Sequence, residues 1–295
     1  MIFLICGPTC SGKSSLAIKL ARAINGEIVN GDAFQVYKEL NIGTAKPTLE
    51  ERNIVPHHLF DFVSPEKKYS VCEYQKEARN IIEKLKSTNK HIIIVGGTGL
   101  YQKATLYDFD FQEELKHIDM TDLEHKTNEE LFEYLKNIDE KACETIHPNN
   151  RKRVLRAIEI YRQNGIKKSS IIDNQNHELL YNVCFVGLNM PRDELYQKIN
   201  ARVDFMIANG LVEEVRTLKE KYGENIQAFQ AIGYKELLKY FKKECSLEES
   251  IELIKKNSRN YAKRQMTYFK NQLPITWFND IELAFDFMLQ KVKNN

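Results

Sequence analysis

Short strand-like segments alternate with amphipathic stretches in the first third of the chain. The segments at residues 1–6, 27–30 and 91–95 each lead into a glycine-containing turn, which is typical of strands entering loops. Between them, residues 14–23 and 70–87 carry apolar side chains three and four positions apart, the spacing of a helix with one buried face. This order predicts a parallel sheet with helical crossovers.

Beyond residue 110 the helical period dominates. It predicts helices at about residues 127–146, 149–163, 192–220, 228–242 and 247–271. Two further runs, at residues 183–188 and 274–278, have the apolar character of strands, and we expect them to be the fourth and fifth strands of the sheet. The pattern therefore predicts an α/β fold in which a parallel sheet with flanking helices carries a mainly helical insertion.

The length of 295 residues suggests two domains, or one core with a large insertion. We expect residues 1–190 and 251–295 to form the core, with an acidic helical excursion at about 107–146. Residues 191–250 are then the helical insertion. Six scattered cysteines without a CxxC pair, no charged leader and no apolar run of membrane-spanning length lead us to expect a cytoplasmic protein that does not enter a membrane.

Charge is nearly balanced overall but unevenly distributed. The chain holds 43 basic and 41 acidic residues. Residues 107–144 contain thirteen Asp and Glu against four Lys, whereas residues 149–170 and 251–272 have balances of +6 and +5. Basic segments of this kind either face a polyanion or are solvated helix faces. Charge alone favours the solvated faces.

The residues between the first strand and the first helix match the phosphate-loop pattern GxxxxGK[ST] in full. They are Gly7, Pro8, Thr9, Cys10, Ser11, Gly12, Lys13 and Ser14. Glycines let backbone N–H groups turn toward an anion, the helix N-terminus adds its dipole, and Lys13 adds a charge. The Ser14 hydroxyl has the chemistry of a Mg²⁺ ligand. The motif makes the sheet P-loop-type and indicates a diphosphate or triphosphate, without singling out ATP.

Two more polar groups follow predicted strands at the same sheet edge, where ligands bind in open α/β sheets. Asp32 directly follows the second strand, where its carboxylate could hold Mg²⁺ through water, accept a proton, or cap the turn after Gly31. Thr98, in the glycine-rich turn after the third strand, offers a hydroxyl to a phosphate oxygen. For the pair His57–His58 we expect hydrogen bonding within the fold.

Together the motifs resemble those of the tRNA dimethylallyltransferase family. The matching stretches follow the family order over nearly the whole chain: Gly7–Ser14, Asp32–Tyr37, Asn41–Pro47, Val55–His58, Gly96–Tyr101, Arg153–Glu159, Ala231–Lys235 and Ala262–Gln265. The phosphate loop alone is generic, whereas Asp32–Tyr37 and Ile42–Pro47, taken with Lys263–Gln265, are specific.

The resemblance implies transfer of a dimethylallyl group from dimethylallyl diphosphate to N6 of the adenosine 3′ to the tRNA anticodon, with release of diphosphate. The phosphate loop would hold the diphosphate with Lys13 and Mg²⁺, Asp32 would be the general base, and Thr98 would contact the diphosphate. Residues 191–250 would face the tRNA, and we expect a monomer. Matching positions imply these tRNA contacts: Asp32, Ala33, Phe34, Gln35, Lys152, Arg153, Val154, Leu155, Arg156, Lys263, Arg264, Gln265 and Lys270.

One segment departs from the family pattern, because residues 107–125 contain no Arg and only Lys116, where relatives usually carry a basic residue. Three alternatives stay open: a small-molecule or nucleotide kinase, an adenylate isopentenyltransferase, and a non-catalytic RNA-binding protein. The basic segments favour a macromolecular acceptor over the first two. The intact Lys13, Ser14 and Asp32 argue against the third.

Overall fold

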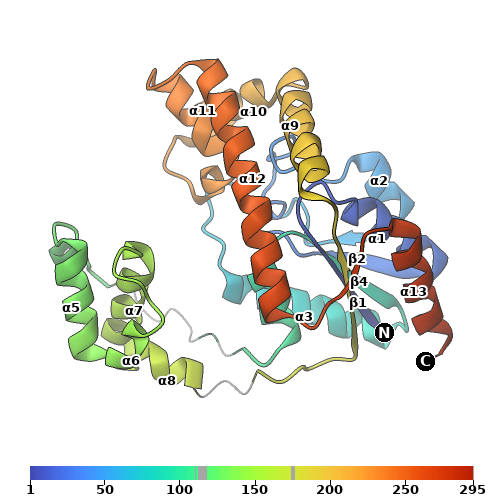
Figure 1. Cartoon of the computed structure of the whole chain (residues 1–295), viewed down its shortest axis with the longest axis horizontal. Coiled ribbons are helices and arrows are strands. Elements are labelled where there is room, and N and C mark those ends of the chain that lie inside the picture. Colours follow the sequence, from blue (N-terminus) through green and yellow to red (C-terminus); the bar gives the residue numbers. More distant parts are fainter. Residues whose placement is uncertain (110, 112–117, 174–176, 295) are drawn as a thin grey trace. The chain divides into compact units, whose positions relative to one another are not determined.

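A computed structural model of the chain describes residues 1–109, 111, 118–173 and 177–294. The chain forms two compact units, which we call the core unit (Met1–Tyr107 with Leu180–Asn295) and the helical unit (Asp108–Leu179) (Figure 1). Lys116 and part of the predicted acidic excursion lie outside the described residues. In the part of the chain that is described, no helix has the length and apolar content to cross a bilayer.

The described strands form one parallel sheet in the core unit. They are β1 (Ile2–Cys6), β2 (Gly26–Asn30), β3 (His57–His58), β4 (His91–Val95), β5 (Val183–Leu188) and β6 (Thr276–Phe278). Their order is β3-β2-β4-β1-β5-β6, with every neighbouring pair parallel. The predicted parallel α/β sheet is confirmed, and the phosphate-loop motif follows a strand at the centre of the sheet.

Strand β3 was not predicted, because two residues are too few to show a period. Its two histidines form hydrogen bonds within the fold, as expected. His57 Nδ1 lies 2.8 Å from the Val55 carbonyl oxygen, and His58 Nε2 lies 2.7 Å from the Glu27 carboxylate.

Helices cover both faces of the sheet. The helices of the core unit are α1 (Lys13–Ala23), α2 (Leu49–Ile54), α3 (Val71–Ser87), α4 (Gly99–Leu106), α9 (Arg192–Ala208), α10 (Leu211–Tyr222), α11 (Tyr234–Phe241), α12 (Leu247–Gln272) and α13 (Ile281–Lys293), with the 3₁₀ turn η2 (Gln227–Gln230). Alternate residues of β1 point to opposite faces: Phe3 and Ile5 meet α1 and α13, whereas Ile2 and Leu4 meet α3, α4 and α12.

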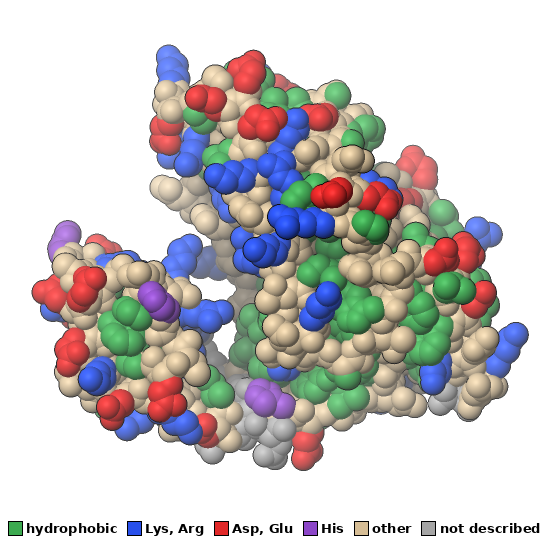
Figure 2. All heavy atoms as spheres, viewed as in Figure 1, with side chains coloured by type: hydrophobic (Ala, Val, Ile, Leu, Met, Phe, Trp, Pro, Cys, Tyr) green, Lys and Arg blue, Asp and Glu red, His purple; other side chains and the backbone are tan. Residues whose placement is uncertain are grey.

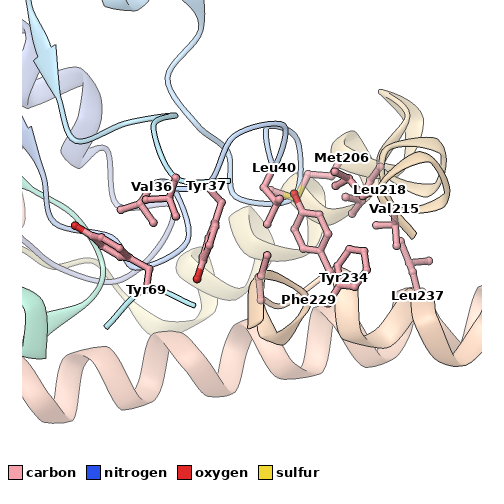
Figure 3. Packing of buried hydrophobic residues seen from close by; sticks show 14 of the residues in the cluster. Val36, Tyr37, Leu40, Tyr69, Met206, Val215, Leu218, Phe229, Tyr234 and Leu237 are labelled. Atoms are coloured by element: carbon pink, nitrogen blue, oxygen red, sulfur yellow. The ribbon is translucent and has the colours of Figure 1, made fainter. Parts of the chain in front are cut away.

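The helix predicted at 192–220 is two helices, because Gly210 adopts a left-handed conformation (φ 98°) between α9 and α10. These helices share a core with the loop that follows β2 (Figure 3). Val36, Tyr37 and Leu40 of that loop pack with Leu218 of α10 and Tyr234 of α11. The structure therefore places residues 191–250 in the core unit and divides the chain elsewhere than at residues 190 and 250.

The helical unit extends beyond the predicted excursion of 107–146. It contains η1 (Thr121–Leu123), α5 (Asn128–Ile138), α6 (Glu140–Cys143), α7 (Arg151–Asn164) and α8 (Lys168–Asp173). Its own core includes Leu131, Leu135, Val154 and Ile158. The buried carboxylate of Asp139 caps α6 and accepts hydrogen bonds from the backbone and hydroxyl of Ser169, which fixes the start of α8.

Candidate active site

The phosphate-loop motif forms a cradle between β1 and α1. Positive φ angles at Gly7 (139°), Cys10 (65°) and Gly12 (88°) turn the backbone around a cavity of about 290 Å³. Lys13 begins α1, so the helix N-terminus faces this cavity. Ser14, in the first turn, is exposed and lines the same cavity. The strand–loop–helix context required for an anion site is therefore present.

Two cationic side chains converge on the cradle. The Lys13 ammonium donates a hydrogen bond to the Pro8 carbonyl, and the Arg202 guanidinium of α9 donates one to Thr9 Oγ1 at 3.0 Å. Burial, with the nearby Arg202 charge as a second cause, lowers the pKa of Lys13 to about 8. Like charges held this close in a desolvated cavity are relieved by a bound polyanion. Arg202 was not predicted as a site residue, because it lies outside every sequence motif.

Asp32 is held at the sheet edge by its neighbours. The Asn30 side chain donates to the Asp32 carbonyl (3.0 Å) and accepts from the Asp32 N–H (2.9 Å), and it is fully buried. Asp32 Oδ1 accepts the Phe34 N–H at 2.9 Å, so the turn-capping role is real. Burial raises the pKa of the Asp32 carboxyl, and backbone hydrogen bonds oppose the rise. Asp32 lines the cradle cavity.

The glycine-rich loop after β4 packs directly against the Asp32 loop. A Cβ at Gly96 would lie 2.1 Å from the Gly31 carbonyl carbon, so only glycine fits there. Thr98 Oγ1 accepts the Ala33 N–H at 3.0 Å, and the Thr98 N–H donates to the Gly31 carbonyl at 3.0 Å. Thr98 therefore ties the two loops together. It is not among the residues that line the cradle cavity, and its predicted contact with a phosphate oxygen stays a prediction.

A second cavity, of about 270 Å³, adjoins the phosphate cradle. Its wall is largely apolar and includes Phe34, Ile199, Val203, Met206, Ile232 and Ile254. Thr9, Asp32, Arg202 and Tyr261 line both cavities. The arrangement suits a ligand with an anionic head and an apolar part, with a carboxylate at the junction between the two.

The Asn41–Pro47 motif borders both cavities, and the structure shows what holds it there. Glu214 of α10 accepts hydrogen bonds from the backbone N–H groups of residues 41, 42 and 43, and from the Tyr234 hydroxyl. The Gln35 amide donates to the carbonyls of Thr44 and Ala45 at 3.0 and 3.2 Å. The side-chain NH₂ group of Gln35 therefore forms hydrogen bonds within the fold.

The basic residues predicted to contact RNA fall into both units. Lys263, Arg264 and Lys270 are exposed on α12, where Lys and Arg side chains gather in the space-filling view (Figure 2). Lys152 and Arg153 are exposed on α7 in the helical unit.

Some residues of the same predicted set are not available as surface contacts. Val154 is fully buried in the core of the helical unit and Leu155 packs against that core. Arg156 pairs with Glu159 at 2.7 Å but keeps 42% of its side chain exposed, so its predicted tRNA contact stays a prediction. Gln265 is buried beside the phosphate cradle. The helical period explains the correction, because a basic face on one side of a helix requires an apolar face on the other.

The central strand, the glycine-rich loop that follows it and the helix that begins at Lys13 are the arrangement of a P-loop-type α/β protein. The sequence model described as IPP transferase matches residues 35–272, and the chain belongs to this family. It is 48% identical over 279 residues to the tRNA dimethylallyltransferase of Anoxybacillus flavithermus, covering 94% of this chain and 90% of the relative. It is 43% identical to that of Staphylococcus haemolyticus, covering 99% of this chain and 90% of the relative.

Solved structures resemble the chain over its whole length. The tRNA isopentenylpyrophosphate transferase of Staphylococcus epidermidis has a TM-score of 0.75 and 41% identity, covering 100% of this chain and 99% of that one. A eukaryotic dimethylallyltransferase captured acting on tRNA has a TM-score of 0.86 and 30% identity, covering 100% of this chain and 80% of that one. The family resemblance inferred from the motifs is therefore confirmed.

Proposed function

We propose that this protein transfers a dimethylallyl group from dimethylallyl diphosphate to N6 of the adenosine 3′ to the anticodon in tRNA and releases diphosphate. The observation that carries the proposal is the pair of adjoining cavities that share Asp32. One is a cationic phosphate cradle, and the other is largely apolar. The names of the similar proteins support a tRNA acceptor.

In this proposal the cradle binds the leaving group. Lys13, Arg202 and the N-terminus of α1 surround the cavity with positive charge, and negative charge builds on the diphosphate as the allylic carbon–oxygen bond breaks. Groups aimed at developing charge stabilise the transition state more than the ground state. The apolar cavity then has room for the dimethylallyl group and for the edge of a flipped adenine.

Asp32 would act as the base. The N6 lone pair forms a bond to C1 of the donor, the C1–O electron pair leaves with the diphosphate, and the N6 proton passes to the Asp32 carboxylate. Oδ1 is engaged by the Phe34 N–H, so the remaining oxygen is the proton acceptor in this scheme. Asn30 holds the backbone on both sides of the Asp32 α-carbon, which keeps the carboxylate at the junction of the cavities.

Mg²⁺ fits the donors at the cradle. The Ser14 hydroxyl and the Asp32 carboxylate line the same cavity, and hydroxyl, carboxylate, phosphate and water oxygens are the ligands that Mg²⁺ prefers. When bound, the ion would supply charge neutralisation to the leaving diphosphate. Ser14 is the residue we expect to hold it.

The exposed basic residues of α12 and α7 would contact tRNA phosphates. Contacts of this kind position a nucleic acid without reading its sequence. A cytoplasmic location and a monomeric state remain predictions from the sequence.

The proposal is tested by incubating the protein with radiolabelled dimethylallyl diphosphate, Mg²⁺ and either unmodified tRNA or AMP. We expect label in tRNA, and in the N6-substituted adenosine next to the anticodon after nuclease digestion. Label in AMP alone would favour transfer to a free nucleotide. Absence of label from both acceptors, with diphosphate still bound, would reject prenyl transfer.

A further inference from the structure

Gln265 lies on the basic helix α12, yet it faces the interior. Gln265 is only 5% exposed, whereas the preceding Lys263 and Arg264 are exposed. Ala262 and Phe269, three positions before it and four after, are also buried. Gln265 therefore lies on the face of α12 that packs on the core unit, and not on the face that presents charge to solvent.

Both ends of the Gln265 amide are engaged by backbone groups of the two ligand-binding loops. Oε1 accepts the Thr9 N–H of the phosphate cradle at 2.9 Å, and Nε2 donates to the Gly97 carbonyl at 2.9 Å. These partners lie 256 and 168 residues away in the sequence. One side chain thus bridges the loop after β1 to the loop after β4.

The contact with the glycine-rich loop is so close that any larger residue at Gly97 would displace the Gln265 amide. A Cβ at Gly97 would lie 2.3 Å from Gln265 Nε2. The Tyr261 hydroxyl, one turn earlier on α12, donates to the same Gly97 carbonyl at 3.1 Å. Helix α12 therefore clamps this loop through two side chains on its inner face.

The bridge continues into the cationic part of the cradle. The Thr9 N–H donates a hydrogen bond to Gln265. The Arg202 guanidinium in turn donates one to the Thr9 hydroxyl oxygen at 3.0 Å. Gln265 thus fixes the backbone of the residue that orients Arg202. Removal of the bridge would leave a part-buried N–H without this partner and a buried carbonyl with the Tyr261 hydroxyl alone, which costs more than removal of a hydrogen bond at the surface.

We propose that Gln265 is a positioning residue for the diphosphate cradle and not a tRNA contact, so that adjacent positions of α12 serve the two substrates separately. This inference rests on the proposed function for its substrates. Gln265 then affects binding of the prenyl donor through Thr9, and the exposed Lys263 and Arg264 contact the tRNA.

The test compares Gln265→Met with the nearby exposed Lys263→Met in the full-length protein. Methionine keeps the length and volume of the side chain but forms neither hydrogen bond. Affinity for inorganic diphosphate with Mg²⁺ is measured by calorimetry, and tRNA affinity by titration at several salt concentrations. For Gln265→Met we expect about a tenfold or greater loss of diphosphate affinity and an unchanged tRNA affinity at every salt concentration. Lys263→Met should leave diphosphate affinity intact and reduce the salt slope for tRNA by about one unit.

A second variant keeps the inference testable should Gln265→Met fold poorly. Gln265→Glu is isosteric. Its neutral acid both accepts from Thr9 and donates to Gly97, whereas its carboxylate cannot donate, and burial raises the pKa of a carboxyl placed there. The ratio of its diphosphate affinity to that of the parent should therefore fall by about tenfold or more as pH rises across that pKa. The charge of that carboxylate also repels bound diphosphate, so Gln265→Glu tests whether this side chain lies at the cradle, and Gln265→Met tests its two hydrogen bonds.

Three results would overturn the inference: a reduced tRNA affinity in Gln265→Met with normal diphosphate affinity, no change in either affinity, or a Gln265→Glu ratio that is flat with pH. Failure of the parent to label tRNA would reject the proposed function alone. The diphosphate measurements use no acceptor and would still decide the role of Gln265.

Discussion

The lowered pKa of Lys13 makes donor binding sensitive to alkaline pH. Lys13 is charged below about pH 8 and neutral above it, so the cradle loses one positive charge as pH rises through that value. We expect kcat/KM for dimethylallyl diphosphate to fall on the alkaline side with an apparent pKa near 8, because kcat/KM reports the groups of the free enzyme. The acid limb should reflect Asp32, whose pKa burial raises.

Lys13→Ala is the control for this profile. It should lower kcat by about 100-fold or more and remove the inflection near pH 8, while tRNA affinity changes little. An alkaline limb that persists in Lys13→Ala would assign the inflection to another group.

Single residues also show where the sequence was informative. The motif residues Lys13, Asp32 and Thr98 were identified because each follows a predicted strand in a recognisable turn. The role of Arg202 and the inward orientation of Gln265 were not identified, because both depend on tertiary contacts with Thr9. These contacts span 193 and 256 residues of sequence. A basic residue on a helix gives no local sign of which partner it meets.

At the scale of elements, the contact between α10 and the 41–43 loop should contribute measurably to stability. Glu214→Gln replaces one of the two carboxylate oxygens that accept three backbone N–H groups and the Tyr234 hydroxyl. We expect the free energy of unfolding to fall by about 1–3 kcal/mol, measured by urea denaturation. KM for the donor should rise as well, because the motif borders both cavities.

The adjacent Glu213→Gln is a matched control. Glu213 pairs only with the exposed Arg216 in the contacts described, and such surface pairs contribute about 0–1 kcal/mol. Equal destabilisation by the two substitutions would mean that Glu214 acts as a general surface charge and not as the anchor of the loop.

The elements themselves were largely predictable. The strands β1, β2, β4, β5 and β6 and the helices α1, α3, α7 and α12 fall where their periods placed them. Four helices begin with a capping box, such as Ser70 with Glu73 in α3 and Ser246 with Glu249 in α12, a signal that sequence alone carries. The break at Gly210 was missed, because the apolar period continues across it.

For the whole molecule, the helical unit should be removable without loss of the phosphate cradle. It has its own core, and the Leu180 N–H donates to the Leu106 carbonyl at 2.9 Å where the chain leaves and re-enters the core unit. Replacing residues 108–179 by a Gly-Ser linker of about four residues should give a protein that unfolds cooperatively and binds diphosphate as the full chain does.

The same variant should bind tRNA more weakly, with a salt slope lower by about one unit for each tRNA phosphate that the protein no longer neutralises. The expectation follows from Lys152 and Arg153, which are exposed on α7. Calorimetry with diphosphate checks the expected cradle binding, and salt titration with tRNA checks the expected loss of tRNA contacts. Loss of diphosphate binding would show that the core unit depends on the helical unit. An unchanged salt slope for tRNA would mean that the basic residues of α7 face solvent and do not contact tRNA.

The division of the chain was the part of the architecture that the sequence could not supply. Helical periods at 127–163 and 192–242 look alike, and nothing in the pattern says which helices share a core. In the structure α9–α11 bury their apolar faces against Val36, Tyr37 and Leu40 (Figure 3), whereas α5–α8 bury theirs against one another.

The central claim is that the two cavities serve one transfer reaction with Asp32 at their junction. Single-turnover transfer from labelled dimethylallyl diphosphate to tRNA, in preformed enzyme–tRNA complexes of the parent and of Asp32→Asn, tests it most directly, because product release does not contribute. Asparagine keeps the shape and the acceptor for the Phe34 N–H but cannot take the proton. The account predicts that Asp32→Asn slows transfer by about 10²–10⁴-fold while diphosphate and tRNA binding stay close to those of the parent. Transfer at the parent rate would contradict it and leave Asp32 with its turn-capping role alone.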